Sequence, residues 1–132
     1  MSEQNVEIVR RALDAYARRD IAALTALHHP DIEVDWSTSH GWYAGVYHGN
    51  DAFMQLVEES FQVFEMSVIE AESYIPAGDA VVVPNVAYQR GRQGVQTTAR
   101  STMVFTVHER KITNIRLYQE TAEALKAVGL AE

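Results

Sequence analysis

The chain has 132 residues, 47% of them hydrophobic and 22% charged, which is the composition of a single soluble globular domain. It contains no cysteine, which excludes disulfides, thiolate metal sites and a cysteine nucleophile. A formal net charge of −7 repels nucleic acid, and no apolar run is as long as a membrane span or signal peptide. We therefore expect one cytoplasmic domain over residues 1–132 that binds neither nucleic acid nor membrane.

Two amphipathic helices are predicted at the start of the chain. After Ser2, apolar residues recur at spacings of three and four, which predicts a helix that ends near Arg19. Asp20 is a favoured cap for a second, shorter helix that Pro30 stops. The apolar stripe of this second helix includes His28, so the imidazole shares a face with leucines.

A strand and a third helix follow, separated by an irregular segment. Residues 31–36 alternate with a period of two, which predicts a strand with Trp36 facing inward and Asp35 facing outward. Segment 37–49 fits neither period, and it is too aromatic for a plain solvated loop. Its aromatic residues either form a flap that closes over the pocket or anchor an ordinary loop on the third helix. Asn50 then caps a third helix, which has the strongest apolar stripe in the chain.

Four strands and a short helix are predicted in the second half of the chain. The strand-like segments are 66–75, 80–90, 96–108 and 111–119, and the turns between them have the lengths of hairpin connections. Four consecutive strands joined in this way indicate an antiparallel meander. Residues 121–128 predict a last helix, which Gly129 closes in a left-handed conformation.

This order of elements predicts an α+β domain. Each helix has one apolar stripe to bury, and a sheet of four or five long strands is the only surface large enough to accept three of them. Long twisted strands curl, so helices that do not fill the concave side of the sheet leave an apolar cavity there. We expect the function to reside in that cavity.

The most distinctive segments are 5–16 (NVEIVRRALDAY), 19–27 (RDIAALTAL), 29–36 (HPDIEVDW), 45–50 (GVYHGN), 77–83 (AGDAVVV) and 118–130 (YQETAEALKAVGL). Together they resemble the SnoaL-like branch of the nuclear transport factor 2-like superfamily, which includes ketosteroid isomerases, limonene epoxide hydrolases and polyketide cyclases. The resemblance covers almost the whole chain, as a single SnoaL-like domain. It is fairly specific for the fold and weak for the chemistry.

The resemblance implies a cystatin-like fold, in which a cone-shaped, curved antiparallel sheet forms a barrel with helices packed on its concave side. It also implies a ligand pocket between the sheet and the first three helices, and a homodimer that pairs through the outer side of the sheet.

The catalytic groups of the superfamily are not evident at the matching positions. Ala12, Trp36 and Met103 stand where ketosteroid isomerases have a helix tyrosine, a carboxylate base and a second acid. The two aspartates that an arginine bridges in the epoxide hydrolases have no counterpart either. Polyketide cyclases use an acidic residue in the pocket, and Asp35 is the candidate closest in sequence.

Two residues are candidates for acid–base chemistry. His28 is the first, because imidazole titrates near physiological pH; the alternative is a partly exposed histidine at a helix end. Asp35 is the second, although it is one residue off the inward register. Predicted ligand-binding residues are aromatic or methionine side chains, which alternatively just fill a core: Tyr16, Trp36, Trp42, Phe61, Tyr88, Met103 and Phe105.

No metal or cofactor is predicted, because His28, His29, His40 and His48 are irregularly spaced and no inward carboxylate completes a ligand set. The predicted partners are a small hydrophobic ligand and a second copy of the chain. The side chains expected on the outer sheet face mix apolar, polar and charged types, as a dimer surface or a solvated face does: Arg100, Thr102, Val104, Thr106, Arg116 and Tyr118.

Three functional hypotheses follow from these patterns. The first is an isomerase, cyclase or hydrolase that acts on a hydrophobic, ring-containing substrate with His28 as acid or base. The second is a non-catalytic ligand-binding or accessory module, which the missing carboxylates favour. The third is a pairing domain whose outer sheet face is the functional surface.

Overall fold

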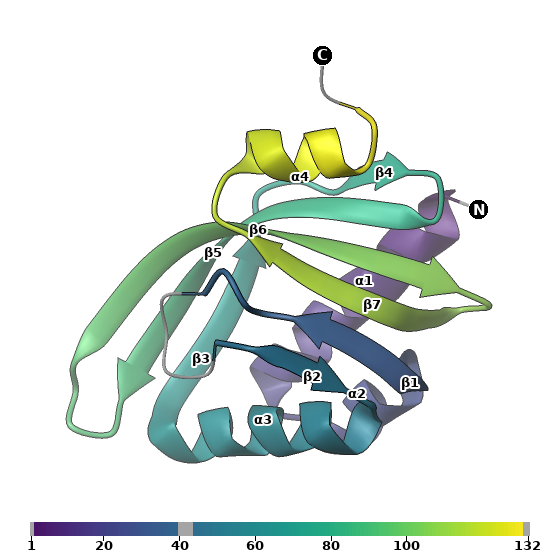
Figure 1. Ribbon diagram of the computed structural model, residues 1–132. Helices are drawn as coiled ribbons and strands as arrows, with labels where there is room; N and C mark the ends of the chain where they lie inside the picture. The colour runs from purple at the N-terminus through teal and green to yellow at the C-terminus, as the bar shows by residue number, and fades with distance from the viewer. Residues whose placement is uncertain (1, 40–43, 131–132) are drawn as a thin grey trace.

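The computed structural model describes residues 2–39 and 44–130 (Figure 1). Over these residues the elements follow in the order α1 (Ser2–Arg18), α2 (Ile21–Leu27), β1 (His28–Asp35), β2 (Val46–His48), α3 (Asn50–Val63), β3 (Phe64–Ala71), β4 (Ile75–Ala77), β5 (Ala80–Gly91), β6 (Gln96–His108), β7 (Lys111–Tyr118) and α4 (Thr121–Ala127). This is the predicted order with two short strands added, β2 and β4.

The first two helices meet at a joint that also holds the third helix. Asp20 caps α2 as predicted, and its Oδ1 accepts a hydrogen bond from the backbone nitrogen of Ala23 at 3.0 Å. Arg19, just before the cap, ends α1 with a left-handed φ of +58°. Its guanidinium donates to the carbonyls of Phe61 at 2.8 Å and Phe64 at 2.6 Å, at the C-terminal end of α3.

The strands form one strongly bent sheet in the order β2-β1-β7-β6-β5-β3, with β4 paired to β5 (Figure 1). The predicted meander is confirmed, because β3, β5, β6 and β7 pair antiparallel in that order. The exception to antiparallel pairing is β1 with β7, where Val34 lies opposite Ile115. β7 pairs with β6 only from Thr102 onward, so the first part of β6 pairs with β5 but not with β7.

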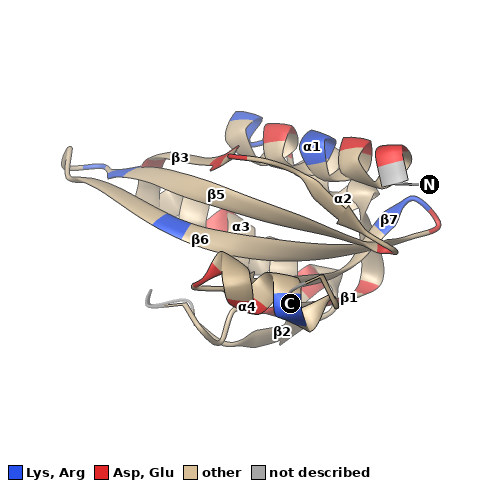
Figure 2. Ribbon diagram, turned by 90° about the horizontal axis from the view of Figure 1, so that it is seen from above, with Lys and Arg blue, Asp and Glu red and all other residues tan. Residues whose placement is uncertain are grey.

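Helices cover both faces of this sheet. In Figure 2, α1 and α4 lie on opposite sides of β5 and β6. The core between α4 and the sheet contains Val82, Val104 and Ala124. The sequence placed Thr102 and Val104 on an outer face that was either a dimer surface or solvated. Both alternatives are wrong for these two residues, because the chain's own last helix buries them.

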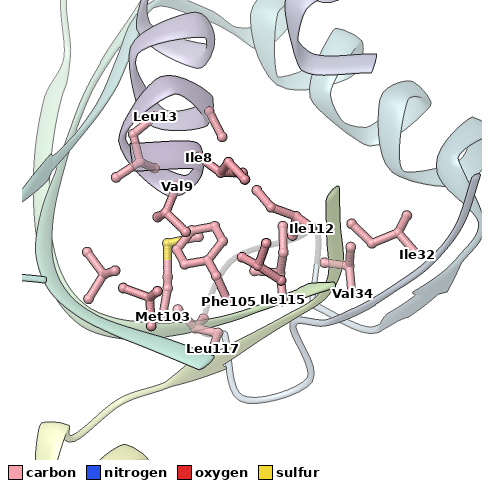
Figure 3. Close-up of a cluster of buried hydrophobic side chains, with 14 residues drawn as sticks. Ile8, Val9, Leu13, Ile32, Val34, Met103, Phe105, Ile112, Ile115 and Leu117 are labelled. Atoms are coloured by element: carbon pink, nitrogen blue, oxygen red, sulfur yellow. The ribbon is translucent and has the colours of Figure 1, made fainter. Parts of the chain in front are cut away.

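The main core lies between α1 and the concave face of the sheet (Figure 3). Ile8, Val9 and Leu13 of α1 pack toward Phe105 of β6 and Ile115 of β7. Burying a side chain such as Phe105 contributes about 1.5–3 kcal/mol, so this cluster fixes α1 on the sheet. Several members of this cluster, including Leu13, Met103 and Phe105, also line the cavity described below.

Charged side chains alternate in sign along the outward face of α1 (Figure 2). Glu7 pairs with Arg11 and Asp14 with Arg18, each four residues apart. Such exposed pairs contribute about 0.3–0.5 kcal/mol each, which makes α1 a solvated covering helix. None of the helices in the described part of the chain is long and apolar enough to cross a membrane.

Two local predictions between β1 and α3 need correction. Gly49, with a φ of +90°, caps α3, whereas the predicted cap residue Asn50 is the first residue of the helix. The side-chain oxygen of Asn50 is buried without a hydrogen-bond partner among the described residues. The irregular segment 37–49 includes β2, where Tyr47 pairs with Val34, so part of the expected flap is an edge strand of the sheet.

Candidate functional site

A cavity of about 320 Å³ lies between the concave face of the sheet and the helices. Its walls combine helix residues such as Leu13, Leu24 and Phe53 with sheet residues such as Met103 and Phe105. The size is within the range of small-molecule sites in proteins. None of the described residues that line it is an aspartate or a glutamate.

His28 is the titratable group set deepest in this cavity wall. It caps the C-terminus of α2 and begins β1, and only 3% of the residue is exposed. Nδ1 lies 2.6 Å from the Leu24 carbonyl oxygen, and since a carbonyl can only accept, Nδ1 carries the hydrogen. The edge of the ring meets Phe53, with ring centroids 5.0 Å apart.

The environment keeps His28 neutral. Burial lowers the pKa of the imidazole, and the hydrogen bond to the Leu24 carbonyl offsets only part of this effect. Because Nδ1 carries the hydrogen of the neutral ring and donates it to the Leu24 carbonyl, the other ring nitrogen, Nε2, is an acceptor at physiological pH. Among the described residues no hydrogen-bond partner reaches Nε2. The wall of the cavity therefore contains an unused lone pair.

Tyr16 joins a chain of hydroxyl groups at another part of the cavity. Ser60 donates to the Val57 carbonyl at 2.8 Å, so the Tyr16 hydroxyl donates to Ser60 at 3.3 Å. Ser67 in turn donates to Tyr16 at 2.7 Å and accepts from Gln89 at 3.3 Å. Because each hydroxyl has one proton, this order of donors is fixed. Tyr16 thus lines the cavity with its ring while its hydroxyl is engaged in the wall.

Three neutral amide side chains line the cavity, two from β5 and one just after the end of β7. The sequence analysis did not identify them. Asn85 is 1% exposed, donates to the Val83 carbonyl at 2.9 Å and accepts from Ser101 at 3.3 Å. Gln89 and Gln119 also line the cavity. Asn85 lies two residues after Val83 and therefore on the same face of the strand. This pattern could have placed Asn85 inward, but three consecutive valines, Val81 to Val83, hide which face of the strand is the inner one.

Four of the predicted ligand-binding residues line the cavity: Tyr16, Trp36, Met103 and Phe105. Met103 and Phe105 come from β6, and their inward register agrees with the period-two pattern of that strand. Trp42 lies outside the described residues. His28 and Trp36 reach the same cavity from the two ends of β1.

Asp35 is not brought to the cavity. Its carboxylate accepts hydrogen bonds from the backbone nitrogen and hydroxyl of Ser37, at 3.0 and 2.6 Å, and lies 3.4 Å from the Arg116 guanidinium. These contacts, with Ser37 first, lower the pKa of Asp35. The inward neighbour on the strand is Val34, so the outward register of Asp35 separates it from His28.

Tyr88 and Phe61 also lie outside the cavity lining, and their predicted positions are corrected here. Tyr88 is 37% exposed on the outer face, because its neighbours Ala87 and Gln89 are the ones that line the cavity. Phe61 packs against the ring of Tyr16 at 5.3 Å and under the Arg19 guanidinium at 4.9 Å. It supports the cavity wall from outside.

Metal ligands do not gather in the described part of the chain. No group of three histidine, aspartate or glutamate side chains there is placed to hold a metal ion. His40 lies outside the described residues. His48 pairs with Glu33 at 3.4 Å on the exposed edge formed by β1 and β2.

Comparisons with known proteins agree with this fold. A family model described as a SnoaL-like domain matches residues 9–115. No curated protein matches the sequence. Among solved structures, an NTF2-like protein from Burkholderia xenovorans LB400 is 25% identical, with 98% of each chain covered and a TM-score of 0.75.

Two further solved structures are similar at lower identity. Bal32a, from a soil-derived mobile gene cassette, is 19% identical over 89% of each chain, with a TM-score of 0.80. TerC, which was co-crystallised with polyporic acid, is 19% identical over 95% of this chain and 98% of its own, with a TM-score of 0.76. These likenesses confirm the predicted cone-shaped α+β architecture.

Proposed function

We propose that this chain, which belongs to the family of SnoaL-like domains, binds a small hydrophobic, ring-containing molecule in its cavity and uses His28 to move a proton on it. One observation carries the proposal. A buried, neutral imidazole with an unused Nε2 lies in the wall of an otherwise largely apolar cavity of about 320 Å³. That the solved structure of TerC contains polyporic acid adds support for a ligand in this fold.

The geometry suits His28 to general acid–base catalysis. Nε2 takes a proton from a carbon beside a carbonyl group of the ligand, while the Leu24 carbonyl holds Nδ1–H and stabilises the positive charge that develops on the ring. Return of the proton to a different carbon gives an isomerisation. Attack of the resulting carbanion on a second carbonyl within the same molecule, followed by return of the proton from Nε2 to the new alkoxide oxygen, gives a cyclisation. Activation of a water molecule by the same nitrogen gives a hydrolysis.

The alternative is a non-catalytic ligand-binding module. It is favoured by the lack of any carboxylate among the described lining residues and by the placement of Asp35 outside the cavity. In that case the cavity holds its ligand and Nε2 of His28 serves only as a hydrogen-bond acceptor. The two functions differ in whether a bound molecule loses a proton.

A general test uses 5-nitrobenzisoxazole, a flat molecule that opens when a base removes one C–H proton. The bonding electrons form a nitrile, the N–O bond breaks, and the released nitrophenolate is followed by its absorbance. We expect saturable acceleration by the native protein and a loss of about 100-fold in rate in His28→Phe. The rate should rise with pH through the lowered pKa of His28 and then level off.

Three comparisons make this test decisive. His108→Gln alters an exposed histidine and should leave the rate unchanged. Asp35→Asn should also leave it unchanged, and a large loss there would restore Asp35 as a catalytic residue. Binding of naphthalene without any acceleration would refute catalysis and support the binding-only alternative.

The outer face of the sheet supports a second proposal, a homodimer. α4 covers only part of this face. Beyond it, the register places Val68, Tyr88 and Thr98 side by side on β3, β5 and β6. Tyr88 and Thr98 are exposed, and tyrosine is enriched at protein interfaces. A second copy of the chain that pairs across this patch would bury it, as the family resemblance implies.

A further inference from the structure

The cavity lining is almost free of charge. Among the described residues that line it, the only permanently charged one is Arg100. Its side chain is 73% exposed and pairs with Glu72 at 2.6 Å, so the guanidinium is already neutralised at the surface. The other lining residues with polar side-chain groups carry amides, hydroxyls, the indole N–H of Trp36 and the neutral imidazole of His28. Nothing in this lining compensates a buried ionic ligand.

Several polar groups of the wall are already paired with one another or with the backbone. The Tyr16 hydroxyl is hydrogen-bonded to Ser60, which in turn donates to a backbone carbonyl. The Asn85 amide is hydrogen-bonded to the Val83 carbonyl and to the Ser101 hydroxyl. Nε2 of His28 has no hydrogen-bond partner among the described residues, and only 3% of the residue is exposed. A ligand that covers this acceptor without donating to it leaves the acceptor buried and unpaired, which weakens binding, whereas a ligand that donates a hydrogen bond avoids this penalty.

We infer that the cavity selects uncharged aromatic molecules that carry a hydrogen-bond donor, such as a phenolic or enolic hydroxyl, and that the donor binds Nε2 of His28. This inference rests on the proposed function and adds a ligand class to it. The apolar walls receive the ring, and His28 recognises the hydroxyl. An anion is rejected because no cation is available to it inside and because the protein as a whole carries a net charge of −7.

The preference can be measured with three molecules of similar shape. 2-Naphthol is uncharged and has a donor, naphthalene has no donor, and 2-naphthoate is an anion. Calorimetric titration of the native protein at pH 7.5 should show 2-naphthol binding about tenfold more tightly than naphthalene. 2-Naphthoate should bind at least about tenfold more weakly than 2-naphthol, because its carboxylate loses its hydration without a partner.

His28→Phe keeps an aromatic ring against Phe53 but removes the acceptor. In this variant the affinity for naphthalene should persist, which shows that the cavity is intact, while the advantage of 2-naphthol disappears. His108→Phe places the same substitution on an exposed histidine of β6 and should keep the full preference.

The outcomes separate this inference from the function on which it rests. Equal affinity of the native protein for 2-naphthol and naphthalene, or tighter binding of 2-naphthoate, overturns the inference and leaves ring binding in place. Failure of all three compounds to bind the native protein overturns the proposed function itself. A preference for 2-naphthol that survives in His28→Phe assigns the recognition of the hydroxyl to another group and overturns the assignment to His28.

Discussion

The properties of His28 follow from its position, where α2 passes into β1. The last turn of a helix has carbonyl groups without helical partners, and the Leu24 carbonyl accepts Nδ1–H in that place. The backbone geometry thereby sets the tautomer of the imidazole and directs the lone pair away from the helix. The residue that caps α2 is thus also the residue to which we assign the proposed proton transfer.

Burial of His28 should make the protein less stable in mildly acidic solution. The lowered pKa means that the folded state binds the proton more weakly than the unfolded state, whose histidine titrates near about 6.5. The free energy of unfolding is therefore full above that pH and falls as the pH drops toward the folded-state pKa. Urea titrations between pH 7.5 and 5 measure the decline.

His28→Phe should flatten this decline, whereas His108→Gln should not. His48, Asp51 and Lys111 border a shallow depression that His28 also borders, and no pairing of any of them with the imidazole contributes to its shift. An equally steep decline in His28→Phe would show that another group controls stability in this range.

Residue-level prediction from sequence succeeded where one face of a strand is polar. Trp36 and Phe105 lie in clear alternating patterns, and both line the cavity. It failed at Tyr88, which was placed inward from the family resemblance. The strand gave no alternation against which to check that placement, because Val81, Val82 and Val83 are all buried. The outer-facing Val82 is buried by α4, a long-range contact that local periodicity cannot report.

Two arginines distant in sequence hold the end of α3. Arg19 donates to the carbonyls of Phe61 and Phe64, and Arg92, from the β5–β6 turn, donates to those of Gln62 at 2.6 Å and Phe61 at 3.1 Å. They supply positive charge and donors where the helix leaves its carbonyls unpaired. The α1–α2 joint and the β5–β6 hairpin are thereby connected through one helix terminus.

Because both arginines donate to the Phe61 carbonyl, their contributions to stability should be coupled. We expect Arg19→Met and Arg92→Met each to lower the free energy of unfolding by about 1 kcal/mol. The double variant should lose more than the sum of the two, since only then is the Phe61 carbonyl left without a donor. Urea unfolding measures the three variants, with Arg11→Met as an exposed control near zero. Strict additivity would show that the shared carbonyl is unimportant.

Elements were predicted more reliably than their docking. The last helix and its closing Gly129 were predicted from sequence, and the helix forms over Thr121–Ala127. Its position on the outer face was not predicted, because a short, alanine-rich helix fits many surfaces. Thr121 bonds to Thr102 at 2.6 Å and Ala124 packs on Val82 and Val104, and these contacts depend on the finished sheet.

At the scale of the molecule, the two faces of the sheet differ in what they contact. The concave face forms the cavity, and the outer face is divided between α4 and the uncovered patch of Val68, Tyr88 and Thr98. The sequence predicted the cavity side from apolar stripes that all had to be buried. The sequence could not show which part of the outer face the last helix covers and which part stays open, because a surface that packs against a helix and a surface that packs against a second copy have similar compositions.

Adjacent threonines on β6 provide a matched test of the proposed dimer. Thr98 pairs with Tyr88 on the outer face, and Thr97 pairs with Gln89 on the cavity side. Thr98→Glu should shift the mass measured by light scattering from dimer to monomer, because two like charges meet across a two-fold axis. Thr97→Glu should remain dimeric. A native protein that is monomeric at micromolar concentrations, or equal behaviour of the two variants, would exclude this interface.

The parallel pairing of β1 with β7 joins segments that are far apart in the sequence. Val34 meets Ile115 only after nearly the whole chain has left the ribosome, whereas the β5–β6 hairpin closes between near neighbours. Both Val34 and Ile115 belong to the cavity wall. We therefore expect the β5–β6 hairpin to form before β1 docks beside β7, and the cavity wall to be complete only after that docking.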